Sequence, residues 1–371
     1  MLRDGDLATG PLRVARPSLP AFDDYADALA AVWESGQLSN FGPMAVRFEE
    51  HCRAYTGLRH VRATSSCDIG LTLAVRALGL EPGTPVLVPS FTFASTLHAL
   101  LWNGLEPRFV DVDPGTWCLT AESCAGAADG VGAIVGTHAF MGICDVVGLE
   151  ALAAEAGAAL MFDAAQALAS WVGPLHVGEF GDASVFSFSP TKVATCGEGG
   201  LAAFRDAGAA ERFELLRSYG SDDAYDSRFV GLNGKLSELH AALGCKTVPA
   251  IEDEVSARLA LADRYRERLA GVDGVALQAL APGVRPTPTQ LVVDLGSRRD
   301  AVAARLAAAG IDTRPYFRPM HRMERFRDLP ATAMPVTDRL GASLLALPLH
   351  RALDLGDVDR VCDAVEHALS A

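Results

Sequence analysis

Three polar side chains follow apolar stretches at points where an α/β sheet would place its chemistry. Asp163 ends the apolar run that starts at Ala159, and Ser187 and Lys192 follow the stretch that begins at Ala183. Open parallel sheets bind ligands at the carboxyl ends of their strands. A buried carboxylate is unfavourable without a cation or hydrogen bonds, although Asp163 could also simply cap the next helix. Lys192 alone could equally be a surface lysine, so the two residues are informative only together.

Together these side chains match what pyridoxal phosphate chemistry requires. A lysine amine forms the Schiff base with the coenzyme, and an acid keeps the pyridine nitrogen protonated so that the ring accepts electrons. The phosphate needs hydroxyls and backbone amides at a helix N-terminus. Ser187 and the turn 65–68, which opens a helical pattern over Gly70–Leu80, can provide them. The residues therefore favour a pyridoxal phosphate site centred on Lys192 and Asp163.

Alternating strand and helix patterns must position these residues. Apolar runs separated by helical spacing of apolar residues indicate βαβ crossovers and a mostly parallel sheet. The stretches 183–188 and 200–204 are too close in sequence for a helix between them, so we expect two neighbouring strands. The other predicted strands are 85–90, 107–113, 132–136 and 159–163.

The pattern changes towards the C-terminus, where long helical segments dominate. Helical spacing over 236–244 and 255–269 is interrupted near Pro249, because proline cannot continue a helix. A last amphipathic helix follows near the end of the chain. We expect a large coenzyme-binding domain over residues 1–249 and a smaller α/β domain over residues 250–371.

Composition and charge exclude several classes of protein. The 371 residues are 50% apolar and 21% charged, with a net charge of −14. This composition is typical of a globular chain with two domains, and the negative charge argues against nucleic-acid binding. Neither a membrane span nor a signal peptide is indicated, so we expect a cytoplasmic location. Eight cysteines without CxxC or paired Cys/His spacing indicate reduced thiols, and we expect no metal site.

Longer motifs connect the chain to a known family. Over residues 15–367 it resembles the DegT/DnrJ/EryC1/StrS sugar aminotransferases, which have the type I fold of pyridoxal-phosphate-dependent transferases. The most specific signal is Asp163-Ala-Ala-Gln166 followed by Ser187, Lys192 and Gly197-Glu-Gly-Gly200. The further motifs are Leu38–Pro43, Val88–Phe93, Gly231–Glu238 and Leu345–His350. The resemblance implies a large, mostly parallel sheet domain and a smaller C-terminal α/β domain.

The resemblance also assigns roles around the coenzyme, pyridoxal 5'-phosphate. Lys192 would form the Schiff base and shuttle protons, and Asp163 would pair with the pyridinium nitrogen. Gln166 would contact the hydroxyl side of the ring, and Phe93 would stack on its face, although such an aromatic is more often a core residue. Ser187 would bind the phosphate.

Residues near the C-terminal half are implied to complete the site. Asn233 matches a residue that family members send into the neighbouring subunit's phosphate site, which implies a homodimer with shared active sites. Tyr316 and His321 match a segment near the sugar nucleotide, although an ordinary loop would explain them equally well.

The sequence departs from the family pattern at two places. Cys67-Asp68 stands where many members have Gly-Thr, and an aspartate facing the phosphate would be repelled. We predict that Asp68 turns away and that backbone amides, Ser66 or both hold the phosphate. Lys235 replaces an arginine; it keeps the charge for a donor carboxylate but loses the bidentate fork. Cys196, beside the lysine loop, is interpreted as structural.

The predicted reaction transfers an amino group from L-glutamate to a nucleotide-linked keto-deoxysugar, with pyridoxamine 5'-phosphate as the intermediate form of the coenzyme. The Leu38–Pro43 opening, the Ser-Ser-Cys turn and the Asn-Gly-Lys element are most similar to members that aminate C-4 of dTDP-4-keto-6-deoxyglucose. Antibiotic sugar biosynthesis would be the setting.

Other functions stay open at this level. The alternatives are a C-3 aminotransferase on a dTDP-3-keto sugar and an aminotransferase of a non-nucleotide cyclic ketone. Relatives that catalyse C-3 dehydration carry histidine in place of the lysine, so Lys192 argues against that activity. A non-catalytic regulator is disfavoured by the intact pair of Lys192 and Asp163.

Overall fold

Seven short, largely apolar strands form the large sheet of the protein. The structure is a computed structural model that describes residues 11–222, 224 and 226–370. The strands lie in the order β1-β9-β8-β5-β4-β2-β3. The run from β8 to β3 is parallel, whereas β9 is antiparallel to both of its neighbours. The mostly parallel sheet and the neighbouring pair β8–β9 are thereby confirmed. The strands are β1 (His60–Thr64), β2 (Pro85–Pro89), β3 (Glu106–Val110), β4 (Ala133–Thr137), β5 (Ala159–Asp163), β8 (Ala183–Ser187) and β9 (Gly200–Phe204).

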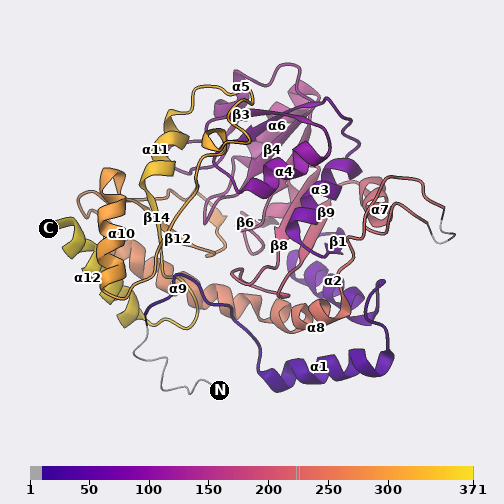
Figure 1. The fold of residues 1–371 in the computed structure, drawn as a ribbon, viewed down its shortest axis with the longest axis horizontal. Coiled ribbons are helices and arrows are strands. Elements are labelled where there is room, and N and C mark those ends of the chain that lie inside the picture. Colours follow the sequence, from indigo (N-terminus) through magenta and orange to yellow (C-terminus); the bar gives the residue numbers. More distant parts are fainter. Residues whose placement is uncertain (1–10, 223, 225, 371) are drawn as a thin grey trace.

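Most helices of this part pack against strands of the large sheet, whereas the first, α1 (Phe22–Ser35), lies apart from it (Figure 1). Helix α3 begins at Cys67, three residues before the predicted start at Gly70, because the Ser66 hydroxyl accepts a hydrogen bond from the Ile69 amide and caps the first turn. The helices of this part are α1 (Phe22–Ser35), α2 (Pro43–Thr56), α3 (Cys67–Ala77), α4 (Ala94–Trp102), α5 (Ala121–Ala125), α6 (Val146–Ala156) and α7 (Ala207–Leu216).

Two consecutive helices, α8 (Glu238–Thr247) and α9 (Ile251–Leu269), connect the large sheet to the C-terminal part. Figure 1 shows them one after the other along the lower side of the molecule. A 3₁₀ turn over Val248–Ala250 separates them at Pro249, so the predicted interruption is confirmed. Helix α8 packs on α2, and α9 packs on the last helix, α12 (Leu355–Ser370).

A second, antiparallel sheet lies in the C-terminal part, in the order β10-β12-β14-β13. Helices α10 and α12 cover it, and apolar side chains of α9, α10 and α12 share its core. The elements are β10 (Ala276–Leu277), β12 (Leu291–Asp294), α10 (Arg299–Ala308), β13 (Arg314–Pro315), α11 (Pro335–Ser343) and β14 (Leu344–Leu347).

Segments cross the proposed domain boundary near residue 250 in both directions. The Leu12 amide donates to the Gly310 carbonyl at 2.8 Å, which ties the N-terminal segment to the C-terminal part. In the opposite direction, β11 (Val284–Arg285) pairs with β6 (Trp171–Val172), which also pairs with β7 (Leu175–His176). The division at residue 250 therefore stays a proposal. No helix in the described part of the chain is long and apolar enough to cross a membrane.

Candidate active site

The strand register brings several predicted site residues to one edge of the large sheet. Asp163, the last residue of β5, pairs with Val185 of β8. Ser187 ends β8 and pairs with Gly200, which in turn pairs with Thr64 at the end of β1. Because α3 follows β1 almost directly, its N-terminus lies beside these strand ends.

Glycine at position 200 is required by the close approach of α3 to the sheet. A Cβ atom on Gly200 would lie 2.6 Å from the Ser66 carbonyl oxygen and 2.6 Å from Thr64 Oγ1. Real Cβ atoms do not approach other atoms so closely, so any side chain there would push the start of α3 away. This explains in steric terms the last glycine of the Gly-Glu-Gly-Gly motif.

Asp163 is held as a buried acid, with 3% of its surface exposed. Its Oδ2 accepts a hydrogen bond from Thr96 Oγ1 at 2.6 Å, and its Oδ1 accepts one from the Ala165 amide at 3.1 Å. Burial raises the pKa of Asp163, while these two hydrogen bonds and the charge of Lys192 act to lower the pKa. A carboxylate in this state is suited to pair with a cationic group placed next to it.

A row of threonine hydroxyls behind Asp163 was not predicted. Thr92 Oγ1 lies 2.7 Å from Thr96 Oγ1 and 2.9 Å from Thr137 Oγ1, so three buried hydroxyls lead to the Asp163 carboxylate. The available signal was the spacing of Thr92 and Thr96 by one helical turn, just after an apolar strand. Such hydrogen bonds fix the orientation of a functional carboxylate.

Lys192 lies in the loop 188–199 that joins β8 to β9. Burial lowers the pKa of its ammonium group, and the charges of Cys67, Asp163 and Glu198 oppose that effect. Lys192 and Asp163 are each among the charges that shift the pKa of the other, and the register of β5 and β8 places Asp163 and the start of the lysine loop at the same end of the sheet. The chain contains three lysines, of which the other two are Lys235 and Lys246.

The N-terminus of α3 offers donors for an anion. Its first-turn amides, including those of Cys67 and Asp68, have no acceptor within the helix, and the helix dipole adds positive potential. Ser66 is occupied in part as the cap, and Ser187 Oγ accepts from the Ser189 amide at 3.3 Å. Cys67 is buried, and burial raises the pKa of its thiol. These groups fit a phosphate.

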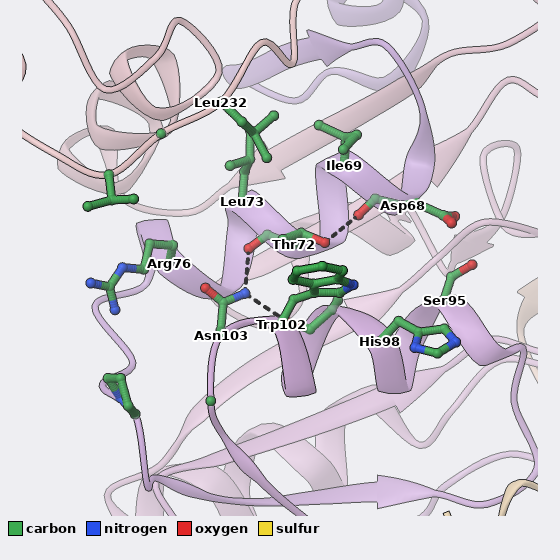
Figure 2. Close-up of a pocket in the computed structure, with 15 residues that line it drawn as sticks. Asp68, Ile69, Thr72, Leu73, Arg76, Ser95, His98, Trp102, Asn103 and Leu232 are labelled. Atoms are coloured by element: carbon green, nitrogen blue, oxygen red, sulfur yellow. Dashed lines mark hydrogen bonds between the residues drawn. The ribbon is translucent and has the colours of Figure 1, made fainter. Parts of the chain in front are cut away.

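Asp68 lines a groove between α3 and α4, with a volume of about 870 Å³ (Figure 2). In Figure 2 its side chain and Ser95 lie at the same end of the groove, and Trp102 lies across its middle. Asp68 is exposed, whereas its neighbour Cys67 is buried. That the carboxylate avoids the phosphate stays a prediction.

Gln166 is held in a network of amide groups. Its Oε1 accepts from the Phe140 amide at 2.5 Å, and its Nε2 donates to Gln290 Oε1 at 3.3 Å. Gln290 Nε2 donates to the Tyr316 hydroxyl at 2.8 Å. The structure thus links Gln166 to Tyr316 through Gln290, a residue that the sequence did not suggest.

His321 is fixed between two elements. Its Nδ1 lies 2.6 Å from Ser90 Oγ, just after β2, and its Nε2 lies 3.0 Å from Asp338 Oδ1 in α11. This row has the residue types of a serine hydrolase triad, but Ser90 is fully buried and its hydroxyl also accepts from the His321 amide at 3.0 Å. The row therefore anchors the segment around His321 and has no nucleophile that a substrate could reach.

Three further predicted site residues take no part in the hydrogen bonds that lead to Asp163. Phe93 immediately precedes α4 and is exposed, which leaves a ring face available. Asn233 is exposed and forms a β-bridge with Ser218. Lys235 is buried with its Nζ 4.3 Å from the ring centroid of Tyr219, and burial lowers the pKa of the amine.

The eight cysteines are all buried and none forms a disulfide, and Cys196 belongs to the core of the large sheet. Within the described residues, no three His, Cys, Asp or Glu side chains gather as a metal site. The cluster at the sheet edge consists instead of an amine, a buried acid and a helix N-terminus whose free amides can bind an anion. This is the set of groups that a pyridoxal phosphate enzyme of the type I fold requires.

Residues 22–366 match the family model described as the DegT/DnrJ/EryC1/StrS aminotransferase family. The chain belongs to this family of pyridoxal-phosphate-dependent aminotransferases.

Two named relatives and a solved structure are also similar to this chain over most of its length. The UDP-N-acetyl-3-dehydro-alpha-D-glucosamine 3-aminotransferase of Acidithiobacillus ferrooxidans is 32% identical over 86% of this chain and 87% of that protein. The dTDP-4-amino-4,6-dideoxy-D-glucose transaminase of Shigella dysenteriae is 28% identical over 84% of this chain and 85% of that protein. The crystal structure of DesI with its TDP-sugar product is 35% identical, covers 96% of this chain and 92% of that chain, and superimposes with a TM-score of 0.90.

Proposed function

We propose that this aminotransferase moves an amino group from L-glutamate to a nucleotide-linked keto-deoxysugar. The observation that carries the proposal is geometric: the strand register brings the buried acid Asp163 and the loop that carries Lys192 to the same end of the sheet, beside the N-terminus of α3. Relatives named for UDP-sugar and dTDP-sugar amination support a nucleotide sugar as the acceptor.

Pyridoxal phosphate, when bound, supplies an aldehyde that condenses with amines and a ring that accepts electrons. Asp163 would hold a proton on the ring nitrogen, and Thr96 orients the carboxylate for this role by its hydrogen bond. The Nζ of Lys192 would take the proton from the α-carbon of the amino donor, and burial favours the neutral amine that this step needs. Positioned proton transfer of this kind contributes about 10²–10⁴-fold to a rate.

Binding groups at the other end of the site orient the coenzyme. Ser187 and the first-turn amides of α3 would hold the phosphate, with Ser66 contributing its amide or hydroxyl. Phe93 would cover a ring face and exclude water from it. Gln166, fixed by the Phe140 amide, would contact the hydroxyl side of the ring. The segment that carries Tyr316 and His321 would lie near the sugar nucleotide.

The acceptor we favour is dTDP-4-keto-6-deoxyglucose, aminated at C-4. The sequence motifs 38–43 and 65–67 support this position, as do the relative named for a 4-amino-4,6-dideoxy product and the structure with a TDP-sugar product. The relative named as a 3-aminotransferase favours a second candidate, amination at C-3 of a 3-keto sugar.

The functional unit we propose is a homodimer with shared active sites. Trp102 is 81% exposed and Val230 is 89% exposed, and both line the groove between α3 and α4. Exposed apolar side chains gathered at a groove are typical of a protein interface. Asn233 is exposed close by in sequence, where a second copy could receive it, and Lys235 would hold the donor carboxylate.

The substrate proposal is tested by supplying the purified holoenzyme with L-glutamate and dTDP-4-keto-6-deoxyglucose. We expect formation of 2-oxoglutarate and a product whose NMR spectrum shows nitrogen on C-4. Nitrogen on C-3 from a 3-keto sugar would establish the second candidate. Turnover of non-nucleotide cyclic ketones alone would contradict a nucleotide sugar substrate.

A further inference from the structure

Arg258, in the middle of α9, contacts the backbone of the lysine loop. Its Nη1 lies 3.4 Å from the Thr191 carbonyl oxygen and its Nη2 lies 3.5 Å from the Lys192 carbonyl oxygen. These two carbonyls belong to the peptide units on either side of the Lys192 Cα. A group that holds both peptide units restrains φ and ψ of Lys192, and with them the direction in which its side chain leaves the backbone.

The guanidinium of Arg258 is itself fixed. Arg258 is 1% exposed and Glu254, one helical turn earlier, is 3% exposed. Arg258 Nε donates to Glu254 Oε1 at 2.5 Å, and Ser18 Oγ donates to the same oxygen at 2.7 Å. A buried ion pair seldom adds much net stability, because removing both charges from water offsets their attraction. The ion pair between Glu254 and Arg258 is therefore more informative for the position that it gives the guanidinium than for its contribution to stability.

The loop has a second anchor further along its chain. The Lys192 amide donates to the Ser189 carbonyl at 3.1 Å within the loop. Further along, Thr247 Oγ1, at the end of α8, donates to the Thr195 carbonyl at 2.9 Å. Helices α8 and α9, which follow each other in the chain on either side of Pro249, thus each donate hydrogen bonds to backbone carbonyls of the loop.

We propose that Arg258, aligned by Glu254, is a positioning residue that sets the backbone direction of Lys192. Since Arg258 is 1% exposed, the proposed role requires no contact between Arg258 and substrate or coenzyme. Its planar fork spans two adjacent carbonyls, which a lysine ammonium at the same place cannot do. Since the amine must reach both the coenzyme and a substrate carbon, a small rotation about the Lys192 backbone misdirects it. Misplacement by about 1 Å can lower a rate by about 10²-fold.

The test compares Arg258→Lys and Arg258→Met with Arg264→Met. Arg264 lies on the same helix and pairs with Asp359, away from the loop. We expect kcat to fall about 10–100-fold in Arg258→Met. Arg258→Lys, which retains a cation for Glu254, should recover only part of this loss. KM values for both substrates should change by less than about threefold, and Arg264→Met should keep the wild-type kcat.

A readout without turnover is hydrogen–deuterium exchange of the apoprotein. We expect the amides of residues 188–197 to exchange about 10-fold faster in both Arg258 variants, but not in Arg264→Met. If Arg258→Met does not fold because Glu254 loses its ion pair with Arg258, the double variant Glu254→Gln/Arg258→Met removes both buried charges and takes its place. Wild-type kcat and wild-type exchange in Arg258→Lys and in the double variant would overturn the proposal.

This inference rests on the proposed role of Lys192, and the two can fail separately. Borohydride reduction of each holoenzyme, followed by peptide mass spectrometry, identifies the lysine that carries the coenzyme. Attachment at Lys235 or Lys246 would overturn the role of Lys192. Attachment at Lys192 with unchanged kcat and exchange in the Arg258 variants would overturn the positioning role alone.

Discussion

The candidate site has two parts: an inner side around Asp163 and an outer side along the groove between α3 and α4. Within one chain, polar groups of the inner side have hydrogen-bond partners, whereas apolar side chains of the outer side are exposed. On the inner side, Asp163 is buried, and its carboxylate oxygens have partners in Thr96 and the Ala165 amide. On the outer side, Trp102 and Val230 expose large apolar surfaces along a groove (Figure 2). The groove meets the inner site at the start of α3, where Cys67 is buried and Asp68 is exposed.

The difference indicates that the residues that position catalytic groups and the residues that join two copies of the chain lie in separate parts of this fold. Buried groups around Asp163 and Lys192 are fixed by strands and by α9, so their geometry exists before any ligand arrives. The exposed apolar face is what we expect of a surface that a second copy covers. Changes on the inner side should therefore act on chemistry, and changes on the outer side should act on association.

The largest effect among the proposed variants is expected on kcat, from Asp163→Asn on the inner side. Loss of the charge opposite the ring nitrogen should lower kcat by about 10²–10³-fold, the size typical of removing one electrostatic partner of a transition state. Steady-state kinetics with saturating coenzyme measure this loss. A kcat within about twofold of wild type would contradict the role of Asp163.

The same variant, which lowers kcat, should raise the thermal stability of the coenzyme-free protein. Burial raises the pKa of Asp163 above its usual value of 3.8, so wild type loses stability as pH rises from that value through the folded-state pKa. The Asp163→Asn variant does not lose stability in this way, so at neutral pH its melting temperature should be higher than that of wild type by about 2 °C or more. This difference in melting temperature should disappear as pH falls below 3.8, the usual pKa of an aspartate. Thermal melts of coenzyme-free protein at several pH values measure it.

A weaker but still large effect is expected from Trp102→Glu on the outer side. A charge in the centre of an apolar interface should raise the dimer dissociation constant by about 30-fold or more, as at other interface hot spots. Sedimentation velocity over a concentration series measures this shift. The matched control is Val147→Glu, because Val147 is an exposed apolar residue on α6, away from the groove. Equal association of both variants would show that the groove is not the interface.

The smallest effect is expected from Thr96→Val, which keeps the shape of the side chain but removes its hydrogen bond to Asp163. That bond lowers the pKa of Asp163, so its loss should raise the pKa and move the acid limb of the pH–rate profile upward. We expect kcat to fall by about 10-fold, with Thr96→Ser restoring most of it. An unchanged profile in Thr96→Val would show that the threonine row serves packing alone.

Much of the fold could be predicted because its strands are apolar runs with sharp ends. Asp163 was predicted as the last residue of its strand, and the break at Pro249 was predicted from the geometry of proline. The start of α3 was predicted too late, because Cys67-Asp68 carries no apolar period and the cap depends on one hydroxyl. The two-residue strands and the crossings near residue 250 have no periodic signal that sequence inspection could detect.

The amino-acid order alone determined which residue types are available: an aspartate after an apolar strand, a lysine after the next one and a serine turn before a helix. Only the tertiary structure decided which distant groups meet them. Thr96 reaches Asp163, Gln290 links Gln166 to Tyr316, and Arg258 reaches the Lys192 backbone. Hydrogen bonds between residues far apart in sequence depend on strand register and helix packing, which local propensity and periodicity do not encode.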